Sequence, residues 1–189
     1  MTQKVIILAS ASPRRQELLR LITDEFAVMP TNVDETLPDN TGPEEAVRTL
    51  ALRKARAAVG GTKSGDIVVG SDTIVVAPNG HILGKPCDRQ EAADMLRTLS
   101  GSVHRVVTGA AVLCGGKETV FTSDASVTFC EMTDDEIDAY LDTGEPFDKA
   151  GAYGIQGRGA RYITGISGDY YAVVGLPVQK LYKVLCTLQ

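Results

Sequence analysis

The chain has 189 residues, a net charge of −5, and 43 % hydrophobic against 23 % charged residues. This composition is typical of a folded globular protein and excludes a disordered one. The acidic balance argues against nucleic acid as a partner, because a phosphate backbone is bound through a basic excess. No segment approaches the roughly 20 apolar residues of a membrane-spanning helix, and Val5–Leu8 is too short for the apolar region of a signal peptide. Four scattered cysteines without a Cys-x-x-Cys pair favour free, buried thiols in a reducing cytosol over a zinc site.

Strand and helix signals alternate along the first half of the chain. Ser12-Pro13 is typical of a helix cap followed by proline at the first helical position, and Thr41–Glu44 of a capping box. The Asn79-Gly80 pair indicates a tight hairpin turn. In order, we expect a strand at 4–8, a helix from 13 to 22, a helix carrying residues 46–58, strands at 67–76 and 81–84, and a helix from 88 that ends at 100–101.

The second half of the chain predicts more strands than helices. Gly115-Gly116 indicates a turn between two long strands, Thr133 and Glu136 indicate a helix start, and a glycine-rich loop covers 149–159. In order, we expect strands at 104–114 and 119–130, a short helix through 137–141, strands at 161–166 and 170–174, and a final helix from 177. Hairpins together with strand–helix units indicate an α/β fold with a mixed sheet.

Two arginines fall in the first turn of the helix expected after Ser12. Arg14 and Arg15 oppose the helix dipole there, at a cost of about 0.3–1 kcal/mol each when exposed. A bound anion would reverse this cost, because the amides of a helix start and two guanidinium groups suit phosphate oxygens. The small residues at 9–12 let a ligand approach the backbone, which favours phosphate binding over two solvated arginines.

Asp72 lies within a run of β-branched residues that predicts burial. An ionised carboxylate in such a place is costly unless a cation or several donors compensate it, and aspartate is a poor strand former. A bulge at Gly70 that exposes Asp72 is the alternative. We favour a functional carboxylate, either a metal ligand or a general base.

The hairpin predicts a neighbour for Asp72. With a two-residue turn at Asn79-Gly80, the continued register sets Lys85 opposite Ile74. Asp72 and Lys85 would then be diagonal neighbours on one face of the sheet, roughly 7–8 Å apart. A lysine in that position either pairs with the aspartate or meets a phosphate beside it.

A lysine projects from the apolar face of the second predicted helix. Lys54 lies at helical spacing from Val47, Leu50 and Ala51, so it shares their face. Such a side chain either extends to the rim of the core or reaches a cleft that holds an anion. Arg53 points elsewhere and is expected to be solvated.

These motifs resemble those of the Maf family of nucleoside triphosphate pyrophosphatases along nearly the whole chain. Each block alone is weak, and the resemblance rests on their order and number. The matching blocks are Leu8-Ala9-Ser10-Ala11-Ser12-Pro13-Arg14-Arg15, Val33-Asp34-Glu35, Lys54-Ala55, Gly70-Ser71-Asp72-Thr73, Gly84-Lys85-Pro86 and residues 148–157.

The resemblance implies an elongated mixed sheet with surrounding helices and two lobes that flank a nucleotide cleft, with residues 1–189 as one domain. It implies hydrolysis of a nucleoside triphosphate at the α-phosphate, with a divalent cation (Mg²⁺ or Mn²⁺), in the cytoplasm. The expected role is the cleaning of nucleotide pools, with a link to cell-division arrest. Neither nucleic acid nor a membrane is expected as a partner, and the sequence leaves a homodimer open.

Within the family, the chain resembles the branch that acts on dTTP and UTP. That branch carries arginine, threonine and glutamine where this chain has Arg14, Thr73 and Gln156, which are thereby assigned to substrate choice. A sister branch that acts on a methylated guanine nucleotide has tryptophan, glutamine and glutamate there. Asp72 is implied to be the proton acceptor. The remaining implied roles are phosphate binding by Ser10, Arg15, Lys54 and Lys85, and metal binding by Glu35 and Asp72.

Two other hypotheses stay open. A nucleotide-binding regulator of cell division would bind a nucleotide without consuming it, which the full set of charged residues argues against. A purine triphosphate substrate would keep the enzyme and change the base. The Gln156 amide offers a donor and an acceptor, which suits the imide edge of a pyrimidine, although a solvent-facing loop glutamine is the simpler interpretation without the family.

Overall fold

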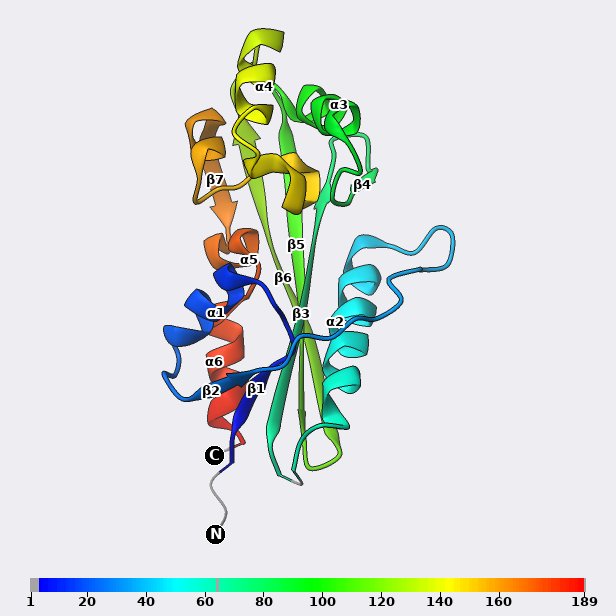
Figure 1. Cartoon of the computed structure of the whole chain (residues 1–189), viewed down its shortest axis with the longest axis vertical. Helices are drawn as coiled ribbons and strands as arrows, with labels where there is room; N and C mark the ends of the chain where they lie inside the picture. Colours follow the sequence, from blue (N-terminus) through cyan, green and yellow to red (C-terminus); the bar gives the residue numbers. More distant parts are fainter. Residues whose placement is uncertain (1–3, 64, 189) are drawn as a thin grey trace. The chain divides into compact units, whose positions relative to one another are not determined.

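The computed structural model describes residues 4–63 and 65–188, and within them the chain forms a seven-stranded sheet with helices packed on it (Figure 1). The sheet order is β2-β1-β3-β5-β6-β7, with β4 paired to β3. β1 is parallel to β2 and β3, whereas the pairs β3/β4 and β6/β7 are antiparallel, so the predicted mixed α/β sheet is confirmed. The strands are β1 Ile6–Leu8, β2 Phe26–Val28, β3 Ile67–Val76, β4 Ile82–Leu83, β5 Val103–Cys114, β6 Lys117–Phe129 and β7 Ile163–Gly168.

The chain divides into two compact units, which agrees with the expected two lobes. The first unit contains the chain up to Asp72, residues 108–123 and the chain from Gly175 onward; the second contains 73–107 and 124–174. A nucleotide cleft between them stays a prediction. The helices are α1 Pro13–Arg20, α2 Pro43–Val59, α3 Arg89–Leu99, α4 Asp134–Leu141, α5 Tyr170–Val174 and α6 Val178–Cys186, with 3-10 turns η1 Glu145–Asp148, η2 Ala150–Ala152 and η3 Arg158–Tyr162.

In the first unit, α2 covers one face of the sheet, and α1 and α6 cover the other (Figure 1). The α2 side of the core is built from small residues, which allow a close approach. A Cβ on Gly70 of β3 would lie 2.3 Å from the Ala51 carbonyl oxygen, and one on Gly109 of β5 would lie 2.4 Å from the Val47 carbonyl oxygen. The backbone of α2 therefore touches two strands directly. The buried cluster on this side is Ile7, Ala9, Ala51, Ala55, Ala58, Val68, Ala111 and Leu113.

In the second unit, larger apolar side chains form the core. α3 begins at Asp88, whose side chain accepts a hydrogen bond from the Glu91 amide as the sequence predicts. α4 begins with the predicted capping box between Thr133 and Glu136. The two helices bury one face each against the sheet, with Leu96, Leu99, Phe129, Ile137, Tyr140 and Leu141 among the buried residues.

The predicted hairpin register is wrong by one residue. The turn has three residues rather than two, because the Ala77 amide donates to the His81 carbonyl at 2.9 Å and Val76 pairs with Ile82. A shift by one residue moves every side chain to the opposite face, and the ladder ends at Leu83, before Lys85. The predicted proximity of Lys85 to the aspartate of β3 therefore has no support from the hairpin.

One predicted element type and one predicted helix cap are also wrong. Residues 170–174 form a helix instead of a strand, because the Asp169 carboxylate accepts from the Tyr171 and Ala172 amides and caps a helical turn. α2 is capped by Gly42 without a side-chain bond, and the Thr41 hydroxyl donates to the Pro38 carbonyl instead.

The four cysteines are free thiols, as expected. The expectation that they are buried is wrong, since Cys87 and Cys186 are exposed and Cys114 and Cys130 are only partly buried.

Candidate functional site

The start of α1 holds Arg15 in a fixed position. The Ser12 side chain caps the helix by accepting from the Arg15 amide, and Pro13 follows at the first helical position as predicted. The Ser10 hydroxyl accepts from Arg15 Nη1 at 3.3 Å, and Arg15 Nε donates to the Gly175 carbonyl at 3.0 Å. The guanidinium is thus bound from two sides at the end of the helix where an anion is favoured.

The Gly175 carbonyl also connects Arg15 to β3. The Ser71 hydroxyl is fully buried and lies 3.0 Å from the Gly175 carbonyl oxygen and 2.9 Å from that of Gly109. A hydroxyl has one proton to donate, so these two acceptors share it. Ser71, the neighbour of Asp72 in β3, therefore shares the Gly175 carbonyl as a hydrogen-bond acceptor with Arg15.

Lys54 joins the two acidic residues that the sequence singled out. Asp72 is 7 % exposed, as expected for a residue inside β3. Lys54 Nζ donates to Asp72 Oδ1 at 2.5 Å and lies 2.7 Å from Glu35 Oε1. The Lys54 side chain therefore extends from α2 to the acids rather than to the rim of the core. One ammonium lies between a sheltered carboxylate and an exposed one.

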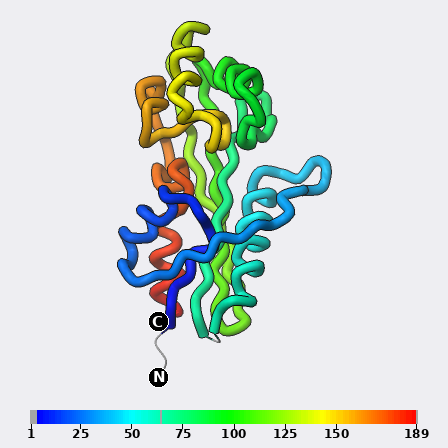
Figure 2. Tube along the Cα trace, in the orientation of Figure 1, coloured from blue at the N-terminus to red at the C-terminus, as the bar shows by residue number. Residues whose placement is uncertain are grey.

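The loop that carries Glu35 is attached to α2 by Arg53. Arg53 Nη1 donates to the carbonyls on both sides of Glu35, those of Asp34 at 2.9 Å and Thr36 at 2.7 Å. Asp34 Oδ1 accepts from the Thr36 amide at 2.9 Å and closes the turn. Figure 2 shows the segment after β2 passing to the α2 side before it folds back into the helix. Arg53, expected to be solvated, is partly buried and also hydrogen-bonded to this loop, and its place beside Lys54 was the only feature of the sequence that pointed to this contact.

Arg15 is electrostatically coupled to the acidic pair. Burial lowers the pKa of its guanidinium; the Asp72 carboxylate opposes this shift, the charge of Arg14 adds to it, and Glu35 opposes it. An arginine stays charged near neutral pH despite such a shift. Arg15 and Lys54 thus interact with the two carboxylates, and the charge of the neighbouring Arg14 acts on Arg15. Three cationic side chains and two carboxylates leave an excess of positive charge suited to a phosphate group.

The other three predicted residues lie in the second unit. Thr73 follows Asp72 in β3 and is partly buried, Lys85 is exposed after β4, and Gln156 is exposed in the glycine-rich segment. The cluster of Arg15, Glu35, Lys54 and Asp72 lies entirely within the first unit.

The carboxylates around Lys54 suit a cation with oxygen ligands. Asp72 Oδ1 and Glu35 Oε1 lie within 2.7 Å of the same ammonium, so both point to one cationic position. Residues 4–63 and 65–188 contain no group of three or more potential metal ligands. Mg²⁺ commonly binds one or two carboxylates, together with waters and substrate phosphates. The two acids therefore fit a cation shared with a phosphate better than a cage made by the protein alone.

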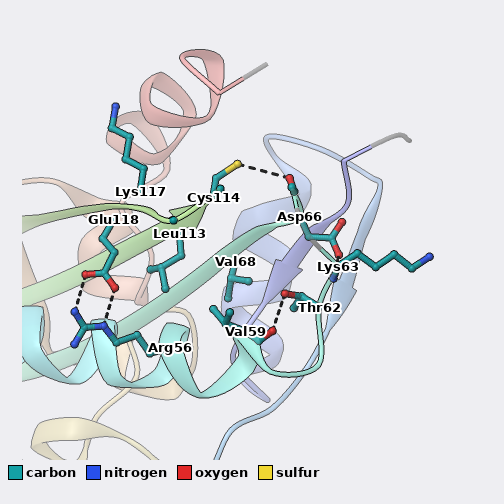
Figure 3. A pocket seen from close by; sticks show the side chains of 13 residues that line it. Arg56, Val59, Thr62, Lys63, Asp66, Val68, Leu113, Cys114, Lys117 and Glu118 are labelled. Carbon is teal, nitrogen blue, oxygen red and sulfur yellow. Dashed lines mark hydrogen bonds and ion pairs between the residues drawn. The ribbon is translucent and has the colours of Figure 1, made fainter. Parts of the chain in front are cut away.

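A separate cavity of about 360 Å³ in the first unit lies between the end of α2 and the β5–β6 turn (Figure 3). Arg56 and Glu118 form a two-fold ion pair at its edge, with both N···O distances at 2.7 Å. Cys114 Sγ faces the Gly65 carbonyl at 3.6 Å. The predicted site residues do not line this cavity.

The fold is that of an α/β protein with a mixed sheet, and its charged cluster has a composition suited to a phosphorylated ligand. The chain belongs to the Maf-like protein family, which matches residues 5–188. The resemblance seen in the sequence is thereby confirmed.

Similar proteins cover nearly the whole chain. A protein of Bacillus cereus named dTTP/UTP pyrophosphatase is 48 % identical over 95 % of this chain and 93 % of its own length. A protein of Bacillus cytotoxicus with the same name is 50 % identical over 96 % and 94 %. Among solved structures, the Staphylococcus aureus Ham1 protein aligns with 67 % of this chain and 72 % of its own, with a TM-score of 0.45 and 19 % identity. In the described part of the chain, every helix is too short or too polar to cross a membrane.

Proposed function

We propose that this chain is a nucleoside triphosphate pyrophosphatase that hydrolyses dTTP and UTP to the monophosphate and pyrophosphate. The names of the relatives support this substrate class. The observation that carries the proposal is the Lys54 ammonium between the Asp72 and Glu35 carboxylates, coupled to Arg15 at the start of α1. Residues 1–189 act as one domain in the cytoplasm, on free nucleotides and without nucleic acid or membrane. A link to cell-division arrest stays a prediction.

In the proposed reaction, water attacks the α-phosphorus. The bond from that phosphorus to the oxygen bridging to the β-phosphate breaks, and pyrophosphate leaves with the electron pair. Asp72 accepts the proton of the attacking water. A sheltered carboxylate suits this role because a general base must be held within hydrogen-bonding reach of the water, and the bond from Lys54 to Oδ1 fixes its orientation.

The positive side chains bind and stabilise the phosphate groups. Arg15, Lys54 and Lys85, with the Ser10 hydroxyl, contact phosphate oxygens and offset the charge that builds on the leaving pyrophosphate. Glu35 and Asp72 would hold a divalent cation, Mg²⁺ or Mn²⁺, which supplies further positive charge to the phosphates when bound.

Arg14, Thr73 and Gln156 select the pyrimidine base. A panel of pyrimidine and purine triphosphates tests this assignment. The Gln156→Glu and Thr73→Gln variants should shift preference away from dTTP and UTP; an unchanged preference in both would assign base choice to other residues.

The Asp72→Asn variant tests the catalytic assignment. We expect kcat to fall by about 10²–10⁴-fold, the usual contribution of a general base. Asparagine keeps an oxygen that accepts from Lys54, so the fold and nucleotide binding should persist. Asp142→Asn, which changes an exposed carboxylate paired with Arg89, is the matched control. Pyrophosphate release is measured as phosphate after addition of inorganic pyrophosphatase, and a wild-type rate for Asp72→Asn would exclude Asp72 as the base.

A further inference from the structure

The glycine-rich segment of the second unit is attached to a single carboxylate. Glu145 Oε2 accepts from the Arg158 amide at 2.7 Å, and Oε1 accepts from the Gly159 amide at 3.2 Å. The Tyr140 hydroxyl donates to the same Oε1 at 2.7 Å. The end of the segment is thus bound to Glu145 through both carboxylate oxygens.

An earlier residue of the segment, Gly154, is bound to the same tyrosine. The Gly154 amide donates to the Tyr140 hydroxyl at 3.0 Å. Gly154 and Gly159 are buried, whereas Gln156 between them is exposed. Gly154 and residues 158–159 therefore meet at Tyr140 and Glu145, and the stretch between them displays Gln156 on the surface.

The close contact between backbone and carboxylate explains the glycine at position 157. A Cβ there would lie 2.3 Å from Glu145 Oε2 and 2.4 Å from Glu145 Cδ. The φ of Gly157 is −110°, which other residues adopt readily. A side chain at position 157 would therefore have to displace the Glu145 carboxylate from its hydrogen bonds to the Arg158 and Gly159 amides.

The surroundings of this pair favour an ionised carboxylate and a neutral phenol. Burial alone would raise the pKa of Glu145, but hydrogen bonds from the Arg158 amide, the Tyr140 hydroxyl and the Gly159 amide outweigh it, so the pKa lies below its usual value. Burial and the neighbouring Glu145 raise the pKa of Tyr140. Near neutral pH the carboxylate is ionised and the phenol donates to it.

We propose that Glu145, supported by Tyr140, is a positioning residue that sets the conformation in which Gln156 meets the nucleotide base. The inference rests on the proposed role of Gln156. A carboxylate is required because both of its oxygens accept from backbone amides, of Arg158 and of Gly159. A carboxamide can satisfy only one of these amides, since in either orientation its NH₂ group faces the other.

The test is base discrimination by the Glu145→Gln variant. The ratio of kcat/KM for dTTP to that for dCTP compares two substrates with the same sugar and phosphates and different base edges. We expect Glu145→Gln to lower this ratio by about 10-fold, as for the loss of one well-placed hydrogen bond, mainly through a higher KM for dTTP. Glu131→Gln, an exposed change in the same unit, should leave the ratio unchanged.

The outcomes separate this inference from the proposed function. If Gln156→Ala does not lower the ratio, recognition of the base by Gln156 fails, and the inference fails with it. If Gln156→Ala lowers the ratio and Glu145→Gln does not, only the positioning role is overturned. An equal loss of activity on both substrates would likewise reduce Glu145 to a structural residue.

A second variant tests the inference independently, should Glu145→Gln not fold. Tyr140→Phe removes the donor to Oε1 and the acceptor of the Gly154 amide while it keeps the ring. It should change the ratio in the same direction as Glu145→Gln. An unchanged ratio in folded Tyr140→Phe would overturn the inference.

Discussion

Gly70→Ala tests how α2 and β3 together set the geometry of the charged site. The new Cβ would lie 2.3 Å from the Ala51 carbonyl oxygen and 2.8 Å from the Ala55 amide nitrogen. The helix backbone would have to move by roughly 1 Å to restore an ordinary van der Waals contact. Lys54 precedes Ala55, so its bond of 2.5 Å to Asp72 would be disturbed by the same movement.

Gly70→Ala should lower both the unfolding free energy and kcat/KM. Overpacking of this kind typically costs about 1–3 kcal/mol of unfolding free energy, and 2 kcal/mol corresponds to a fall in Tm of about 4–8 °C for a chain of this length. A misplacement of about 1 Å in a catalytic group can lower kcat/KM by about 10²-fold. Activity should therefore fall further than stability alone explains.

The assay compares thermal unfolding and dTTP hydrolysis at a temperature where every variant is folded. Gly60→Ala is the matched control, because it lies just after α2 with nothing within 4 Å of the new Cβ. It should leave activity unchanged. If Gly70→Ala unfolds at the wild-type temperature and keeps wild-type kcat/KM, the direct contact of α2 with β3 does not set the site.

Three further predictions concern single side chains. Arg53→Ala should raise the Mn²⁺ concentration for half-maximal activity about 3–10-fold, because two hydrogen bonds to the Glu35 loop are lost. Arg56→Ala is the control, and an equal response of both variants would contradict the role of Arg53. Arg15→Lys should raise KM for dTTP more than it lowers kcat, since a lysine cannot reproduce the guanidinium geometry. Steady-state kinetics measure both constants, and a change in kcat alone would contradict this prediction. Burial lowers the pKa of His104 to about 4, so the folded state binds fewer protons than an unfolded chain with a histidine pKa of about 6.5. The unfolding free energy should therefore fall by about 3 kcal/mol from pH 6.5 to 4, and urea unfolding of His104→Gln should show a shallower decline over the same range.

The elements with continuous patterns were predictable from the sequence. The β-branched run at 67–76 is β3 with the predicted bounds, and the capping residues Asp88 and Thr133 mark the starts of α3 and α4. Residues 170–174 were not, because a short apolar run suits a strand and a helix equally. The hairpin register failed because the length of a turn depends on backbone angles that an Asn-Gly pair alone does not determine.

The candidate site was predictable where a charge interrupts an apolar pattern. Asp72 within β3 and Lys54 on the apolar side of α2 both stood out for that reason, and the structure joins them. Arg53 and Glu145 did not stand out, since their partners are backbone carbonyls and amides. Hydrogen bonds to the backbone leave no periodic pattern in a sequence, and only coordinates reveal them.

The contact of Gly70 and Gly109 with the backbone of α2 bears on how enzymes of this kind diversify. Main-chain atoms meet there without side chains that could be exchanged, so mutation has few ways to retune the spacing of Lys54 and Asp72. The segment around Gln156, by contrast, is held by two side chains, Tyr140 and Glu145, and a single substitution there can change its conformation. With the roles proposed above, a new base preference can therefore arise by changing that segment, while the residues proposed to bind and cleave the triphosphate stay in place.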